Sequence, residues 1–252
     1  MKHTLLFLGT GAADSLNEQF TGFENRDRRR CSSLLVDGHV LFDCGPHALQ
    51  AALALGVDPA KITDIVITHF HADHFDRESV MKIAGAGNRT LHFWVREDAV
   101  FVPFVNCCLH RMTLFEQNDI GGLSVTGLPA NHDAYAQHLS VEKPGFRLFY
   151  GPDGAWLTGE TVNYMRGKKY DVMVMDATVG DTVGDYRMGE HNSIPMLRLM
   201  VPSFNTLEIA HKKTAVILSH MAMCLHKSHE RTVQIVQEDG FTVAYDGMVW
   251  EV

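Results

Sequence analysis

The strongest chemical pattern in the chain is the run His-Phe-His-Ala-Asp-His at residues 69–74. It follows directly on an apolar, β-branched segment that is typical of a buried strand. In an extended segment, residues two apart point to the same side, so His69 and His71 can share one metal ion. A turn after them would bring Asp73 and His74 towards a second position. These nitrogen and oxygen donors would supply most of a two-metal site, whereas the alternative is a loop of solvent-exposed histidines.

Strands and helices alternate in both halves of the chain. Ile62–Thr68 and Asp171–Met175 have the apolar character of buried strands, and Pro46–Leu55 is expected to form a helix that ends before Gly56. This alternation predicts an α/β fold in which two sheets are covered by outer helices. We expect a single domain over residues 1–252, because no linker-like or repeated segment interrupts the pattern.

Two turns in the second half are predicted to close β-hairpins. Pro152-Asp153-Gly154 lies between strands expected at 146–150 and 155–157, and Asp246-Gly247 lies between strands expected at 242–245 and 248–252. A hairpin turn is a poor place for a metal ligand, so Asp153 is the weaker candidate among the acidic residues of this region.

Composition narrows the function classes. The chain has 252 residues, 46% hydrophobic and 21% charged, which is the balance of an ordinary globular protein. The net charge of -8 argues against a broad nucleic-acid-binding surface, so nucleic acid is an unlikely partner on this evidence, and an anionic substrate would need a local cation. The sequence has no apolar stretch long enough for a secretion signal or membrane span, which predicts a cytoplasmic protein without a membrane partner.

The 69–74 motif resembles the signature of the metallo-β-lactamase-fold hydrolases. That resemblance implies an αββα sandwich of two mixed β-sheets with outer helices, and two divalent metal ions at the edge between the sheets. It implies that His69 and His71 bind one metal and that Asp73 and His74 bind the other. Two later histidines at the ends of expected strands match further ligands of the family, namely His132 and His220.

The ligand that bridges the two metals is less clearly matched. The family usually carries an aspartate in a Gly-Asp-Thr-like turn after a strand that bears Trp or Tyr. The corresponding stretch here is Trp156–Thr161, so Glu160 stands where the aspartate is expected. Either carboxylate can bridge two cations, although the extra methylene changes its reach. Alternatively, Glu160 begins a helix and water alone forms the bridge.

Within that family, several segments look similar to the cyclic phosphodiesterases of the carbon–phosphorus lyase pathway. These segments are Arg29–Ser33, Leu41–Gly45, Val172–Asp176 and Ala244–Met248. The resemblance implies that His191 acts on the scissile phosphate. It does not extend to the structural zinc on a Cys-rich loop, because Ala12–Arg30 has no cysteine.

Other polar residues have two interpretations each. Arg29 and Arg30 belong to a basic run that could bind a substrate phosphate, although such a run is more often a solvated loop. Asp43 and Asp176 end expected strands, where they could orient ligand histidines or simply cap a turn.

The sequence thus favours a dinuclear metal-dependent hydrolase that uses Mn²⁺ or Zn²⁺. We expect a phosphodiesterase for small, including cyclic, phosphodiesters, with hydroxide held between the metals as nucleophile and with Asp73 and His191 as catalytic groups. The alternatives are a thioester, other ester or lactam hydrolase, a 3′ tRNA-processing endonuclease, and a non-enzymatic metal-binding module. The apolar run Phe101–Phe104 suggests either a homodimer contact or core packing.

Overall fold

A computed structural model describes residues 2–100, 106–133 and 135–252 of the chain. The described residues form two seven-stranded sheets. The first has the order β14-β1-β2-β3-β4-β5-β6, formed by Val249–Glu251 (β14), Thr4–Gly9 (β1), Ser33–Val36 (β2), Val40–Phe42 (β3), Asp64–Val66 (β4), Leu91–Arg96 (β5) and Cys107–Met112 (β6). The second has the order β13-β12-β11-β10-β9-β8-β7, formed by Thr242–Val243 (β13), Ala210–Ser219 (β12), Tyr170–Asp176 (β11), Phe146–Gly151 (β10), Gln137–Lys143 (β9), Leu123–Pro129 (β8) and Gln117–Ile120 (β7).

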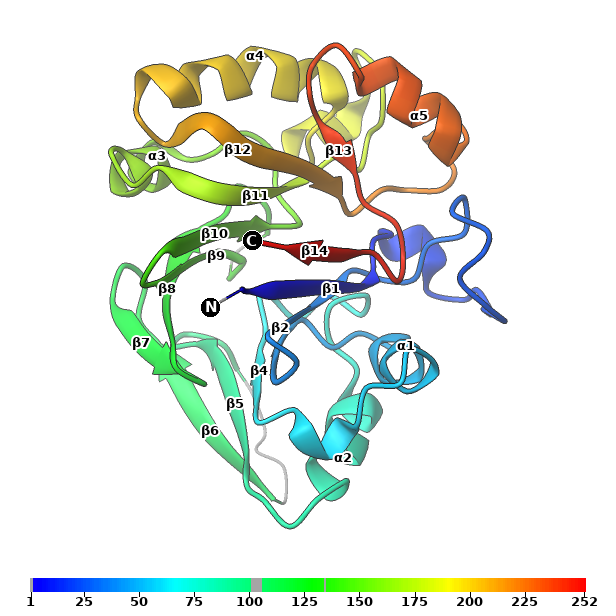
Figure 1. The fold of residues 1–252 in the computed structure, drawn as a ribbon, viewed down its shortest axis with the longest axis vertical. Coiled ribbons are helices and arrows are strands. Elements are labelled where there is room, and N and C mark those ends of the chain that lie inside the picture. The colour runs from blue at the N-terminus through cyan, green and yellow to red at the C-terminus, as the bar shows by residue number, and fades with distance from the viewer. Residues whose placement is uncertain (1, 101–105, 134) are drawn as a thin grey trace.

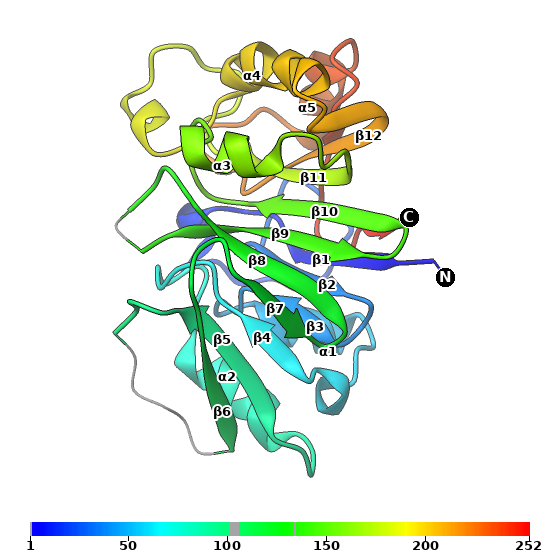
Figure 2. The ribbon, with the colours of Figure 1, turned by 90° about the vertical axis from the view of Figure 1, so that its left-hand side faces the viewer.

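The helices cover the outer faces of the two sheets (Figures 1 and 2). Those on the first sheet are α1 (Ala48–Ala54) and α2 (Arg77–Gly85), and those on the second are α3 (Gly159–Met165), α4 (Ile194–Thr206) and α5 (His229–Val236). Short 3-10 turns lie at Ala13–Ser15, Pro59–Lys61 and Tyr186–Gly189. The αββα sandwich that the sequence predicts is confirmed. No helix of the described chain is both long and apolar enough to cross a membrane.

Successive side chains of a buried strand point to opposite faces of the sheet, and both faces are covered, so the sequence of such a strand is an unbroken apolar run. In β11, Val172 and Val174 belong to the core between the two sheets, whereas Met173 and Met175 pack beneath the outer helices with residues such as Leu197 of α4. Because both faces of the strand are covered, no polar alternation appears in its sequence.

Strand direction decides where the functional residues meet. Strands β3 to β6 are parallel to one another, as are β10 to β13. Strand β8 runs in the same direction as β10, since each pairs antiparallel with β9. The loops that follow β4, β8, β10, β11 and β12 therefore emerge at one edge of the sandwich, the edge at which ligands bind in open parallel sheets.

Both predicted hairpins of the second half are wrong. Strand β10 pairs with β9 and β11, and the chain after Pro152–Gly154 leads into α3, whose N-cap Thr158 accepts a hydrogen bond from the backbone N–H of Thr161. At the C-terminal end, β13 joins the second sheet whereas β14 joins the first, so the chain crosses between sheets through Asp246-Gly247. The proposed dimer contact at Phe101–Phe104 lies outside the described residues.

The basic run does not form the phosphate site that its charge suggested. Arg29 and Arg30 are both only 3% exposed. Arg29 donates to Thr10 Oγ1 and to the carbonyl of Ala244, while the Arg30 backbone N–H and guanidinium both donate to Asp246 Oδ2, at 2.7 and 3.3 Å. These arginines fasten the N-terminal segment to the end of the chain, and the prediction that they bind substrate is corrected accordingly.

We expect Asp246→Ala to destabilise the fold by about 3–5 kcal/mol, because it leaves the Arg30 guanidinium buried without a counter-charge. Urea unfolding at neutral pH measures this change. Glu251→Gln is the matched control, since its partner Lys2 lies in an exposed ion pair and little stability depends on it. Equal midpoints for the two variants would contradict this assignment.

Candidate metal centre and active site

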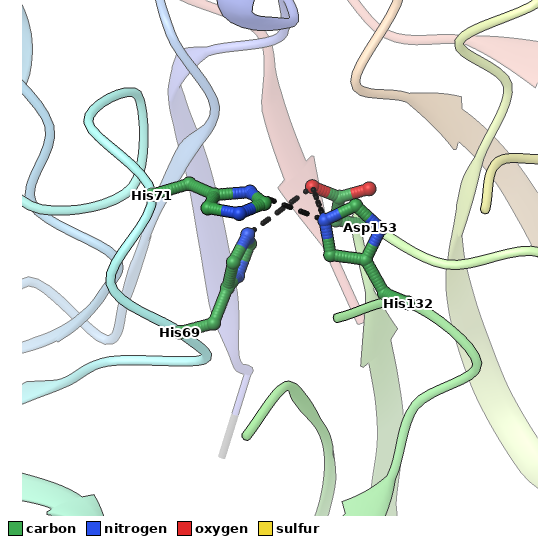
Figure 3. A group of neighbouring side chains, drawn as sticks. All are labelled: His69, His71, His132 and Asp153. Atoms are coloured by element: carbon green, nitrogen blue, oxygen red, sulfur yellow. Dashed lines mark hydrogen bonds and ion pairs between the residues drawn. The ribbon is translucent and has the colours of Figure 1, made fainter. Parts of the chain in front are cut away.

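A first group of potential ligands comprises His69, His71, His132 and Asp153, whose side chains point toward one another in Figure 3. The loop after β4 carries His69 and His71, whereas His132 follows β8 and Asp153 follows β10. One ligand atom from each residue lies within 4.8 Å of the others. Asp153 Oδ2 is 3.3 Å from His69 Nε2 and 3.4 Å from His132 Nε2, and His132 Nε2 is 3.2 Å from His71 Nδ1.

A second group comprises Asp73, His74 and His220, again with one ligand atom each within 4.8 Å. The Nε2 atoms of His74 and His220 are 3.0 Å apart, and Asp73 Oδ2 is 3.2 Å from His220 Nε2. Asp153 Oδ2 also approaches this group, at 3.4 Å from His74 Nε2 and 3.5 Å from His220 Nε2. One carboxylate oxygen is thus shared between the two groups.

Polar neighbours hold the ligand rings in place. Asp43 directly follows β3, and its Oδ2 lies 2.9 Å from His74 Nδ1. Its Oδ1 accepts hydrogen bonds from the backbone N–H and the hydroxyl of Thr68. Thr178 Oγ1 is 2.8 Å from His220 Nδ1. Such partners fix the orientation and tautomer of metal-binding histidines. Asp43 therefore lies where it could orient a ligand histidine, one of the two roles that the sequence suggested for it.

The charges of the site fit a bound divalent cation. Asp73 and Asp153 are at most 4% exposed, and all their recorded ion pairs within the described chain are with histidines. His69 Nε2 is buried, and among the described residues its ion-pair contact is the Asp153 carboxylate at 3.3 Å. Burial, helped by the charge of His74, lowers the pKa of His69 to about 4, so that imidazole is neutral as a metal ligand requires. Carboxylates and neutral imidazoles are donors that Zn²⁺ and Mn²⁺ accept.

His191, expected from the sequence to be a catalytic group, lies beside this cluster. Its Nδ1 is 2.8 Å from Asp153 Oδ1 and 3.0 Å from Asp176 Oδ2. Burial alone would lower the pKa of His191, but the charges and hydrogen bonds of Asp176 and Asp153 outweigh it and raise the pKa to about 11. Asp176 thus orients His191 rather than one of the expected ligand histidines.

The cluster opens into a pocket of about 320 Å³. Its walls include His71, His132, His191 and His220, and Arg187 adds a cationic side chain that the sequence had not singled out. Arg187 sits in the 3-10 turn after β11, a segment with no motif to mark it. Larger surface pockets of 590 and 770 Å³ contain none of the residues of the two ligand groups.

The structure does not bring Glu160 to the cluster. Glu160 is exposed in the first turn of α3, which matches the alternative reading in which it begins a helix. Asp153, the weaker candidate on the expectation of a hairpin turn, occupies the position between the ligand groups instead. The signal for this was Thr158, a helix N-cap residue, which indicates that a helix rather than a strand follows Asp153.

Curated relatives overturn one expectation from composition. A ribonuclease Z from Methanothermobacter thermautotrophicus is 29% identical over 148 residues, which are 51% of this chain and 44% of that protein. The chain therefore matches less than half the length of that relative. The expectation that nucleic acid is an unlikely partner was wrong, because net charge averages over the whole surface and does not report the chemistry of one pocket.

Solved structures share the fold over nearly the full length. A diphosphatase from the PhnP family has a TM-score of 0.76 at 22% identity, covering 100% of this chain and 98% of that one. Zinc-bound PqqB from Methylobacterium extorquens has a TM-score of 0.73 at 18% identity, covering 99% of this chain and 100% of that one. At these identities the likeness shows the fold.

The family assignment rests on the sequence itself. Residues 39–221 match the beta-lactamase superfamily domain, and this range includes every residue of the two ligand groups. The chain therefore belongs to the beta-lactamase superfamily and is a metal-dependent hydrolase of that fold.

Proposed function

We propose that the protein is a phosphodiesterase that holds two divalent cations, Zn²⁺ or Mn²⁺, in adjoining sites. The observation that carries this proposal is the shared position of Asp153 Oδ2, within 3.3–3.5 Å of His69, His132, His74 and His220. In this assignment His69, His71 and His132 would hold one cation and Asp73, His74 and His220 would hold the other, with Asp153 placed to contribute to both.

The chain's own residues would prepare the reaction as follows. Bound cations would supply an activated water and neutralise the phosphodiester oxygens, as two-metal sites do. Asp43 and Thr178 fix the rings of His74 and His220, so that the ligand geometry is set before substrate arrives. His191, held by Asp176, donates a hydrogen bond to the scissile phosphate and a proton to the leaving oxygen. Arg187, at the pocket wall, is ion-paired with Asp185 through Nη1, and the rest of its guanidinium would give the substrate phosphate a further cationic contact.

Two similarities support a bond to phosphorus over a thioester or lactam. The curated relative is named a ribonuclease and one structural relative a diphosphatase, and both names denote reactions at phosphorus. The acidic ligand Asp73 lies beside His220 in the second ligand group, where a harder oxygen donor suits a cation that also binds phosphate oxygen.

A second candidate is cleavage of RNA near a 3′ end, and the ribonuclease Z similarity favours it specifically. Both candidates use the same cluster and differ only in what lies beyond the scissile phosphate. A pocket of 320 Å³ has room for a phosphodiester with its immediate substituents, so an RNA would extend over the surface outside it.

A substrate panel separates these functions. We expect hydrolysis of bis(p-nitrophenyl) phosphate, loss of that activity on chelation with recovery in Zn²⁺ or Mn²⁺, and background rates with His71→Ala. The panel also includes cyclic phosphodiesters, a precursor tRNA with a 3′ extension, a thioester and a lactam. If only the thioester or the lactam is hydrolysed, the phosphodiesterase assignment is wrong.

The Asp153 assignment is tested against Glu160. We expect Asp153→Asn to lower phosphodiesterase activity by more than the roughly 10–100-fold that loss of an outer-sphere partner costs, and to lower the metal content per chain below that of the wild-type protein. Glu160→Gln, which carries the same chemical change on an exposed side chain, should leave both unchanged. Elemental analysis and initial rates measure the two effects. The reverse pattern would restore Glu160 as the bridging ligand.

The proton-donor role of His191 predicts a dependence on the leaving group. His191→Gln should slow hydrolysis of an alkyl phosphodiester by about 10²–10⁴-fold, because an alkoxide needs a proton as it leaves. The same variant should lose less of its hydrolysis rate on a p-nitrophenyl phosphodiester, because p-nitrophenolate leaves without being protonated. An equal loss of kcat on both substrates would assign His191 to holding Asp153 in place instead.

A further inference from the structure

A separate group of metal-binding side chains lies on the first sheet. It consists of His92 in β5 and of Cys108 and His110 in β6, with one ligand atom from each within 4.8 Å of the others. None of the three lines the active-site pocket or belongs to its ligand groups. Two imidazoles and a thiol are the donor set that zinc accepts most readily in proteins.

The pairing of the strands builds this group. In the parallel ladder His92 lies opposite Cys108, and Trp94 lies opposite His110. Cys108 and His110 are two residues apart in one strand, so their side chains share a face. The three donors are therefore placed by backbone hydrogen bonding of the sheet rather than by a loop.

The neighbouring side chains hold one ring and add negative charge. Trp94 stacks on His110 with ring centroids 4.0 Å apart and planes inclined by 15°. The indole N–H of Trp94 donates to Asp64 Oδ1 at 2.9 Å, and the Asp64 carboxylate is 4% exposed. The stacked indole of Trp94 thus fixes the plane of the His110 ring, and the buried carboxylate of Asp64 accepts a hydrogen bond from that indole.

The two imidazoles are arranged to receive a cation. His92 Nδ1 lies 2.8 Å from His110 Nε2, a distance at which only one proton fits between the nitrogens. Cys108 is exposed, so a cation can reach its sulfur from solvent.

We propose that His92, Cys108 and His110 form a further metal site, separate from the two sites proposed in the active site, which binds one zinc-like divalent cation and leaves a fourth position open to water. The cation would join β5 to β6, which is the edge strand of the first sheet in the described chain. The site is independent of the proposed phosphodiesterase function.

Cobalt substitution tests this site in the full-length protein. Co²⁺ bound to a thiolate gives a near-ultraviolet charge-transfer band, which ligation by histidine and aspartate alone does not give. We expect titration with Co²⁺ to produce this band with a stoichiometry of one thiolate-bound ion per chain. Zinc should then displace the cobalt and remove the band.

Matched variants identify the ligands. Cys108→Ser should abolish the band, and His110→Asn should weaken Co²⁺ binding at this site by at least tenfold. Cys107→Ser and Cys224→Ser should keep the band, since Cys107 packs toward α1 and α2 and Cys224 lines the active-site pocket. Circular dichroism verifies that each variant is folded. Absence of the band in the wild-type protein, its persistence in Cys108→Ser, or its loss in Cys224→Ser would overturn the proposal.

Discussion

The contact between Asp153 and four imidazoles is the interaction on which the rest of the site depends. This carboxylate is almost fully buried, and Asp43, Asp73 and Asp176 are buried nearby. So many carboxylates in one region of low dielectric repel one another strongly unless positive charge lies among them. In the described chain these carboxylates contact histidines, and an imidazole carries at most one positive charge. Divalent cations would supply the additional positive charge that balances the carboxylates.

The sandwich gathers these groups from segments far apart in the chain. The loops after β4, β8, β10, β11 and β12 leave the two sheets at a common edge, and each brings one part of the cluster. The left-handed backbone at Asp43 and at His220, with φ of 60° and 53°, turns the chain sharply just after a strand ends. Arg29 and Arg30 contribute to this arrangement from inside the fold, where they join the N-terminal segment to Ala244 and Asp246.

How far the sequence could predict this site depends on whether each signal is local. The metal-binding motif at residues 69–74 could be predicted because its candidate ligands are close in sequence and directly follow a recognisable strand. Resemblance to the family added His132 and His220. Asp153 was ranked below Glu160 because Pro-Asp-Gly is a common hairpin turn, whereas the N-cap Thr158 and the pairing of β10 with β11 show that the chain leaves the sheet there. The C-terminal strands were misjudged for the same reason, since β13 and β14 find their partners in different sheets. Arg187 carried no local signal at all.

We expect Asp153 to lie between two cations. A crystal structure of the metal-loaded protein, with anomalous diffraction measured at the absorption edge of the metal, tests this position directly. We expect two anomalous peaks in the active site about 3.5–4 Å apart, one among His69, His71 and His132 and one among Asp73, His74 and His220, with the Asp153 carboxylate contacting both. A single peak in the active site, or a pair of peaks there that Asp153 does not touch, would contradict this position.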